Sequence, residues 1–246
     1  MNFIPGFRGE TVLFDLDGTL LPMDMNEFEK EYFSGLCRRM ASRAKPEEMY
    51  QYIWGGTRAM VENDGQKTSR EVFRNYLNEN TPLNYDVCEP EFLDFYQNDF
   101  QSCVRICHIT DLSKKIVAAL CGKGYTVAIA TNPIFPQVAT YSRLRWLDMD
   151  PESFPLVTTF ENSHFAKPNP SYYKEVCEKL GVRPEDCVMV GNDVVEDGIA
   201  ASLGMRVILI EDFLLHREKL SGQSFETGSL AAFYEWVQAL PECRGN

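Results

Sequence analysis

Hydrophobic and polar residues follow two different patterns in the two parts of this chain. Between residues about 24 and 103, aromatic and aliphatic residues recur at the three- and four-residue spacing of an amphipathic helix. From about residue 110 onward, short apolar runs alternate with helical patterns. Such alternation is typical of parallel strands joined by helices that cover both faces of the sheet. The pattern therefore predicts an α/β fold with a doubly wound, Rossmann-like sheet and an inserted helical block.

The strands of the predicted sheet are short and apolar. The first is the run Thr11–Phe14, and the others follow at residues about 125–130, 156–160, 187–190 and 206–210. Helices are predicted between and after them, at residues about 112–123, 135–147, 170–180, 195–203 and 229–239. The chain therefore divides into a core domain of residues 1–21 and 106–246 and an all-helical domain of residues 22–105.

The helical domain is predicted to contain four helices. They lie at residues about 24–43, after Pro46, after Thr68 and Ser69, and at residues about 90–103. Their aromatic stripes are most simply the packing faces of a bundle.

Two adjacent glycines interrupt the second of these helices. Gly55 and Gly56 cost a helix about 1–2 kcal/mol relative to alanine, so we expect a bend or a close backbone approach at this point. Trp54 and Arg58 flank the glycines, and Arg58 is a candidate for binding the leaving group of a substrate. The simpler interpretation, which we favour, is a bend between two helices with Arg58 in solvent.

Polar residues stand where the predicted strands end. Because ligands of an open parallel sheet bind beyond the carboxyl ends of its strands, these residues are the candidates for a site. A single one of them is more simply a turn, a cap or a solvated charge, but together they indicate one site. They are Asp15, Asp17 and Gly18 after the first strand, Thr131 and Asn132 after the second, Lys167, and Asn192, Asp193 and Asp197 after the fourth.

Composition and charge restrict the function further. The net charge is −12 over 246 residues, which argues against a nucleic-acid binder because such proteins need a basic face. The eight cysteines lack paired spacing and are expected to be reduced thiols. The chain begins without the apolar segment of a signal peptide, and no apolar run approaches the ~20 residues of a membrane span. A cytoplasmic protein without membrane contact is expected.

Four motifs in this order resemble those of the haloacid dehalogenase superfamily. That family has an Asp-x-Asp-Gly-Thr-Leu block, a strand ending in Thr or Ser, a Lys, and a Gly-x-Asp with a further Asp downstream. The matching residues here are Asp15-Leu-Asp17-Gly18-Thr19-Leu20, Thr131-Asn132, Lys167-Pro168 and Gly191-Asn192-Asp193-Val-Val-Glu-Asp197. The helical block after the first motif resembles the cap of the first cap class in this family. One mild departure is Asn192, which stands where many members have Asp.

The resemblance implies a phosphatase. In the family the first Asp is the nucleophile, so Asp15 is expected to form an aspartyl-phosphate. Asp17 is expected to protonate the leaving oxygen and then to activate water. Thr131, Lys167, Asn132 and Gly18 are expected to bind the phosphoryl group.

The resemblance also implies Mg²⁺. A phosphate dianion ~4 Å from a carboxylate is repelled by roughly 4 kcal/mol per pair of unit charges at an effective dielectric near 20, so several acidic groups require a cation. The expected ligands are Asp15, the main-chain carbonyl of Asp17 and Asp193, with Asp197 as a further or indirect ligand.

The sequence thus predicts a Mg²⁺-dependent phosphatase that hydrolyses a small phosphorylated metabolite. A phosphomutase acting on a sugar phosphate uses the same residues, and the motifs do not separate the two. A binding protein that has kept the fold without catalysis is a third possibility, but such a protein has no need for an acid paired with a nucleophile.

Overall fold

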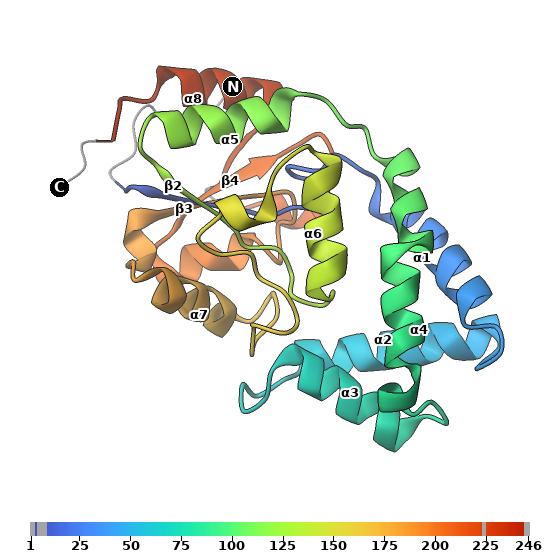
Figure 1. The fold of residues 1–246 in the computed structure, drawn as a ribbon. Coiled ribbons are helices and arrows are strands. Elements are labelled where there is room, and N and C mark those ends of the chain that lie inside the picture. Colours follow the sequence, from blue (N-terminus) through green and yellow to red (C-terminus); the bar gives the residue numbers. More distant parts are fainter. Residues whose placement is uncertain (1–2, 4–8, 223–224, 244–246) are drawn as a thin grey trace.

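The core of the molecule is a parallel five-stranded sheet (Figure 1). The computed structural model describes residues 3, 9–222 and 225–243. Its strands run in the order β2-β1-β3-β4-β5, and every neighbouring pair is parallel. They are β1 (Thr11–Phe14), β2 (Thr126–Ile129), β3 (Cys187–Gly191), β4 (Arg206–Ile210) and β5 (Glu226–Gly228). After β1 the chain adds β2 on one side of it and then β3 on the other side. The switch point between β1 and β3 is where such sheets bind ligands.

Both faces of the sheet are covered, because successive side chains of a strand point to opposite sides. Val12 and Phe14 of β1 belong to one buried cluster, together with residues of α5 (Leu112–Gly122) and α8 (Leu230–Ala239). Leu13 belongs to a second cluster, formed with α7 (Pro170–Leu180) on the other face (Figure 1). These clusters confirm the predicted α/β fold with a doubly wound sheet.

Four helices form a separate group beside the sheet (Figure 1). They are α1 (Met25–Arg39), α2 (Pro46–Val61), α3 (Ser69–Asn80) and α4 (Tyr85–Gln97). The buried cluster that contains Phe14 extends into this group through Phe28 of α1 and Phe95 of α4. Helix α6 (Gln137–Trp146) contacts α4. The boundaries of the predicted helical domain, at residues 22 and 105, stay a prediction.

Five 3₁₀ helices also occur in the described part of the chain. They are η1 (Asp99–Ile106), η2 (Pro151–Ser153), η3 (Pro184–Asp186), η4 (Gly198–Leu203) and η5 (Arg217–Leu220).

The favoured bend at Gly55 and Gly56 is wrong, because α2 continues through both residues, and the alternative, a close backbone approach, is confirmed. A Cβ atom at Gly55 would lie 2.0 Å from the Tyr76 hydroxyl oxygen, and one at Gly56 would lie 2.5 Å from a ring carbon of Phe73. The glycines therefore allow the rings of α3 to pack directly on the backbone of α2, which is the close approach that a missing Cβ permits.

The predicted start of the fourth helix is also wrong. Helix α4 begins at Tyr85, because the Asn84 side chain accepts a hydrogen bond from the Val87 N–H and caps it. Pro90 lies inside this helix and does not open it. The helical pattern then continues beyond α4 as η1.

The strand predicted at residues 156–160 is reduced to one bridge between Ile129 and Val157. A parallel ladder with β2 would continue from the Phe160 N–H to the Thr131 carbonyl. The Phe160 N–H donates instead to the Phe135 carbonyl at 3.0 Å, so the pairing does not extend beyond this bridge.

Two further differences lie near the end of the chain. The helix predicted at residues 195–203 is a turn followed by η4. Strand β5 was not predicted, because three residues at the edge of a sheet give little hydrophobic pattern. In the part of the chain that the structure describes, no helix has the length and apolar character needed to cross a membrane.

We expect Gly56→Ala to destabilise the protein although alanine is the better helix former. Moving the Phe73 ring away from a new Cβ should lower the free energy of unfolding by about 1–3 kcal/mol, which exceeds the helix-propensity gain of at most about 1 kcal/mol. Urea unfolding monitored by circular dichroism measures the change. The matched control is Gly122→Ala in α5, where the structure leaves 4 Å of free space around a new Cβ. Equal stability of Gly56→Ala and the wild type would contradict this explanation of the packing.

Candidate active site

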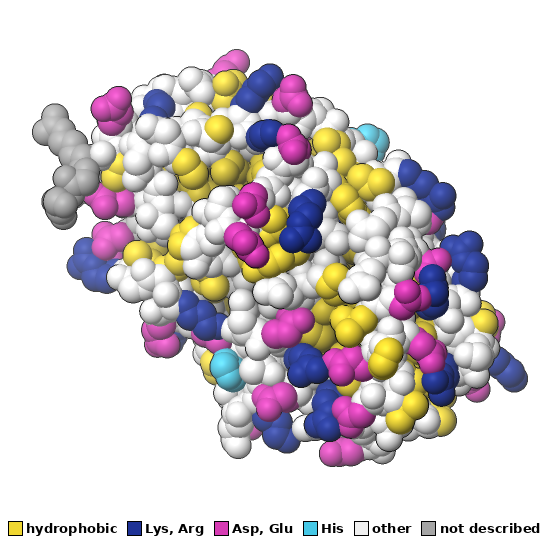
Figure 2. Space-filling model, in the orientation of Figure 1, with side chains coloured by type: hydrophobic (Ala, Val, Ile, Leu, Met, Phe, Trp, Pro, Cys, Tyr) yellow, Lys and Arg dark blue, Asp and Glu magenta, His cyan; other side chains and the backbone are white. Residues whose placement is uncertain are grey.

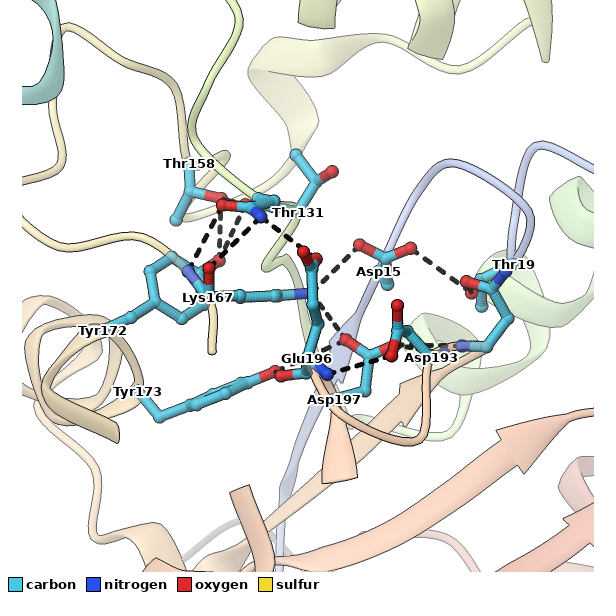
Figure 3. Close-up of polar contacts among 12 residues, drawn as sticks. Asp15, Thr19, Thr131, Thr158, Lys167, Tyr172, Tyr173, Asp193, Glu196 and Asp197 are labelled. Carbon is cyan, nitrogen blue, oxygen red and sulfur yellow. Dashed lines mark hydrogen bonds and ion pairs between the residues drawn. The ribbon is translucent and has the colours of Figure 1, made fainter. Parts of the chain in front are cut away.

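The carboxylate of Asp15 lies directly after β1, next to the side chain of Lys167 (Figure 3). The Asp15 N–H donates to the Val190 carbonyl of β3 at 2.9 Å, so sheet hydrogen bonding fixes the backbone at this point. Lys167 Nζ donates to Asp15 Oδ1 at 3.0 Å and to Asp197 Oδ1 at 2.6 Å. The Lys167 side chain is fully buried, and its two carboxylate partners compensate the charge.

Asp197 holds both Lys167 and the turn that follows β3. Its second oxygen, Oδ2, accepts hydrogen bonds from the N–H groups of Asn192 and Asp193, each at 2.9 Å. A Cβ at Gly191 would lie 2.0 Å from this oxygen, so the carboxylate needs a glycine beside it. Both oxygens of Asp197 are therefore occupied by protein donors.

The buried charges influence one another strongly. Burial raises the pKa of Asp15 to about 7, although the Lys167 ammonium opposes the rise. Burial alone would lower the pKa of Lys167, but Asp15 and Asp197 outweigh it and hold that pKa well above its usual value. Lys167 therefore keeps its positive charge, and a further cation beside Asp15 would favour the ionised form of that carboxyl.

Asp17 forms an ion pair that the sequence did not indicate. Its Oδ2 accepts from Nη1 of Arg143 in α6, and the Arg143 side chain is only 1% exposed. The guanidinium also donates to the Ala139 carbonyl at 3.3 Å and to the Thr140 hydroxyl at 3.2 Å. The other Asp17 oxygen, Oδ1, is buried and has no hydrogen-bond partner among the described residues. Burial raises the pKa of Asp17, and Arg143 limits the rise.

The segment after β2 brings Thr131 (Figure 3) to the same place, and Asn132 lines the same cavity. The Thr131 carbonyl accepts from the Tyr172 hydroxyl of α7 at 2.9 Å. Asn132 Oδ1 accepts from the Lys167 N–H at 3.2 Å, and its Nδ2 donates to Glu196 Oε2 at 3.0 Å. Burial, with nearby acidic groups, raises the pKa of Glu196 to about 8.

Asp193 is held mainly through one of its oxygens. Oδ1 accepts from the N–H groups of Val195 and Glu196 at 2.7 and 3.0 Å and contacts His216 Nδ1 at 2.9 Å. Among the described residues, every hydrogen bond to this carboxylate uses Oδ1. Oδ2 is therefore the oxygen with capacity for a further ligand.

Gly18 acts here through its backbone conformation. Its φ angle is +80°, a region that L-residues rarely adopt, and a Cβ would lie 2.2 Å from Asn192 Nδ2. The following residue, Thr19, donates to Asn192 Oδ1 at 3.0 Å and has a longer contact of 3.4 Å to Asp15 Oδ2. Gly18 thus lets the loop after β1 pack against the loop after β3.

A cavity of about 390 Å³ connects these groups with the helices α1–α4. The predicted residues Asp15, Asp17, Thr131, Asn132, Asp193 and Asp197 all line it. Arg58 is exposed on α2 and is not among the lining residues. The cation that the helices contribute to the lining is Arg70 of α3, and Trp54 also lines the cavity.

The donor set fits a Mg²⁺ ion that is bound partly by substrate. Among the described residues, no group of three or more His, Cys, Asp or Glu side chains is arranged to hold a metal. Mg²⁺ in phosphoryl-transfer sites typically takes one or two carboxylates and completes its shell with water and phosphate oxygens. Asp15 and Asp193 line the same cavity and offer two such carboxylates.

Four residues near the site were not among the sequence candidates. Arg143 and Arg70 lie within helices and His216 directly before η5, while Glu196 stands inside the fourth motif at a position for which the family pattern names no residue. An arginine within a helix is more often solvated than buried, so no local signal distinguishes Arg143 from the exposed Arg145 two residues later.

We expect the ion pair between Arg143 and Asp17 to stabilise the fold measurably. Arg143→Met leaves a buried carboxylate without its partner, which should lower the free energy of unfolding by about 3–5 kcal/mol. In an Asp17→Asn background the same change should cost less, with a coupling energy of about 1–3 kcal/mol from urea unfolding of the four proteins. Arg145→Met on the same helix is the control and should change stability by less than about 0.5 kcal/mol. Additive losses would mean that the two side chains do not interact.

Known proteins similar to this chain include several phosphatases. The pyrophosphatase PpaX of Bacillus cereus (strain AH820) is 26% identical over 184 residues, which are 74% of each chain. PpaX of Bacillus thuringiensis (strain Al Hakam) is 25% identical over 184 residues, again 74% of each chain.

Solved structures show the same fold. A predicted phosphoglycolate phosphatase from Haemophilus somnus has a TM-score of 0.58 at 17% identity, covering 93% of this chain and 97% of that one. CbbY from Rhodobacter sphaeroides, a mutant in complex with xylulose-1,5-bisphosphate, has a TM-score of 0.57 at 19% identity, covering 91% and 95%. A putative β-phosphoglucomutase from Thermotoga maritima has a TM-score of 0.56 at 21% identity, covering 93% and 98%.

A family model decides the classification. The model of haloacid dehalogenase-like hydrolases matches residues 10–203, which include every strand-end motif named above. This match confirms the predicted family and the prediction of an enzyme. The chain belongs to the haloacid dehalogenase-like hydrolases.

Proposed function

We propose that the protein is a Mg²⁺-dependent phosphatase that uses Asp15 as its nucleophile and acts on a small phosphorylated compound. The observation that carries this proposal is the buried Lys167 ammonium, 3.0 Å from Asp15 and 2.6 Å from Asp197, two carboxylates that line one cavity. A carboxylate fixed beside a permanent cation is suited to attack a phosphoryl group, because the cation offsets the repulsion between two anions.

In the first step, a carboxylate oxygen of Asp15 attacks phosphorus, and the bond between phosphorus and the leaving oxygen breaks. Asp17 gives its proton to that oxygen, so the product leaves as an alcohol. Asp17 Oδ1, which is buried without a partner, is the oxygen available for this transfer, while Arg143 holds Oδ2. The raised pKa of Asp17 favours the protonated form that the step needs.

In the second step, water hydrolyses the aspartyl-phosphate. Asp17 now accepts a proton from the attacking water, the bond between Asp15 and phosphorus breaks, and inorganic phosphate leaves. Lys167, together with the side chain of Thr131, binds phosphoryl oxygens through both steps.

Asp15 and Asp193 are the side chains that would hold Mg²⁺, with the main-chain carbonyl of Asp17. When bound, the ion neutralises charge on the transferring phosphoryl group. Asp197 has a different role in this proposal, because both of its oxygens already accept hydrogen bonds from Lys167 and from main-chain N–H groups. We therefore propose Asp193 as the direct ligand and Asp197 as the residue that positions Lys167.

A phosphomutase would share this first step and then return the phosphoryl group to a sugar. The likeness to a putative β-phosphoglucomutase concerns the fold alone. Continuous release of inorganic phosphate favours the phosphatase, whereas isomerisation without release favours the mutase. Because the curated relatives are named pyrophosphatases, pyrophosphate belongs in the substrate panel beside the phosphate esters.

Asp15→Asn should fold normally and lose turnover, because an amide is a poor nucleophile. We expect phosphate release to fall below about a hundredth of the wild-type rate, since loss of an acid–base group alone costs ~10²–10⁴-fold. The control is Asp111→Asn, an exposed carboxylate before α5, which should retain full activity. Retention of more than about a hundredth by Asp15→Asn would refute covalent catalysis through this residue.

Removal of divalent cations should abolish phosphate release, and Mg²⁺ should restore it. Ca²⁺ should inhibit, because it prefers more ligands and a looser geometry than in-line transfer requires. Asp193→Asn should raise the Mg²⁺ concentration for half-maximal activity by at least about tenfold. The control Asp186→Asn replaces a partly exposed carboxylate in η3 and should leave this concentration unchanged. Full activity after exhaustive chelation would overturn the metal assignment.

A further inference from the structure

The cavity that contains Asp15 continues toward α1–α4, and its walls there are aromatic. Figure 2 shows hydrophobic side chains, in yellow, gathered between the sheet part of the molecule and these helices. The lining rings come from both parts of the chain and include Phe28, Phe33, Trp54, Phe92, Phe135 and Phe160. In a phosphatase this region receives the group that is released from the phosphoryl centre.

Several polar side chains of this wall are paired within the protein. The hydroxyls of Tyr32 and Tyr96 lie 2.9 Å apart and bond to each other. The Thr57 hydroxyl donates to the Ile53 carbonyl of its own helix at 2.9 Å. A substrate therefore meets mainly the carbon surfaces of these residues.

The charged side chains of the wall are paired as well. Arg70 of α3 donates to Glu89 of α4 at 2.5 Å, and both line the cavity. Glu29 of α1 accepts from the Tyr50 hydroxyl at 3.0 Å. A polyol placed here would compete with these existing pairs for hydrogen bonds, and incompletely paired buried hydroxyls are unfavourable.

Trp54 provides a flat surface at this cavity. It lines the cavity although it is 42% exposed. The Phe33 ring, which also lines the cavity, is nearly parallel to it, with centroids 6.5 Å apart and an angle of 28°. Tyr50 supports Phe33 from outside at 4.7 Å. Exposed rings held in place by their neighbours bind flat apolar groups at little entropic cost.

We propose that the substrate is a phosphate ester whose leaving group carries an aromatic ring, and that this ring binds in the cavity against Phe33 and Trp54. The inference rests on the proposed phosphatase function and adds the chemical class of its substrate. It excludes compact polyol phosphates, which lack an apolar surface that could displace water from these walls.

The test compares two substrates that differ in the released group but little in leaving-group chemistry. The compounds 2-phenylethyl phosphate and glycerol 3-phosphate are both monoesters of primary alcohols. We expect kcat/KM for 2-phenylethyl phosphate to exceed that for glycerol 3-phosphate by about 10- to 100-fold, because burying the ring removes apolar surface from water. Equal values, or a preference for glycerol 3-phosphate, would overturn the inference.

Variants of the cavity wall test whether the aromatic ring of the substrate binds there. Trp54→Ala should reduce the preference for 2-phenylethyl phosphate at least about fivefold, mainly by lowering kcat/KM for that substrate, while Trp54→Phe should keep most of it. Val87→Ala is the control, because Val87 is an exposed apolar residue of α4 that does not line the cavity. An unchanged preference in Trp54→Ala would contradict binding of the ring at this wall.

A binding measurement separates this inference from the proposed function. Calorimetric titration of Asp15→Asn with each ester reports affinity without turnover. Binding of 2-phenylethyl phosphate that is tighter by about tenfold or more supports the inference. It does so even when the wild type releases no phosphate from any ester. Such a lack of phosphate release would overturn only the proposed phosphatase function. Equal affinities for the two esters overturn the inference even when the wild type hydrolyses both.

Discussion

The contact of the Lys167 ammonium with Asp15 and Asp197 is the interaction on which the rest of the site depends. It joins the end of β1 to the turn after β3, across the switch point of the strand order between β1 and β3. A buried ammonium is tolerated only with such partners, and Asp197 is itself fixed by two main-chain N–H groups. The positions of Asp15 and Asp193 at the cavity follow from this network and from the parallel strands below it.

Much of this arrangement could be predicted from the sequence. Apolar runs followed by Asp15, Thr131 and Asn192-Asp193 predicted strand ends, and parallel strands bring their ends to one edge. The structure places these residues around one cavity, with Lys167 buried behind Asp15 and bonded to it, although the roles assigned to them stay proposals. Helix α7 and strand β4 lie where the pattern indicated, because a clear cap or a continuous apolar run defined each end.

Other features could not be predicted, because they depend on contacts between distant residues. The glycine pair in α2 predicts a break in the helix, and only the structure shows that the rings of Phe73 and Tyr76 pack on it. The apolar run near Val157 has the pattern of a strand, and only the structure shows that the Phe160 N–H pairs with the Phe135 carbonyl and not with β2. Arg143 and the aromatic wall of the cavity belong to helix patterns whose ordinary interpretation is packing.

The central claim is that Asp15 carries the phosphoryl group during turnover, and its most direct test is to detect that adduct. The wild-type protein is quenched in acid during steady hydrolysis of a phosphate ester, digested, and analysed by mass spectrometry. Our account predicts a phosphoryl adduct on the peptide that contains Asp15, and its loss after treatment with neutral hydroxylamine, which cleaves acyl phosphates. Sustained turnover without an adduct, or with an adduct on a different residue, would contradict the account.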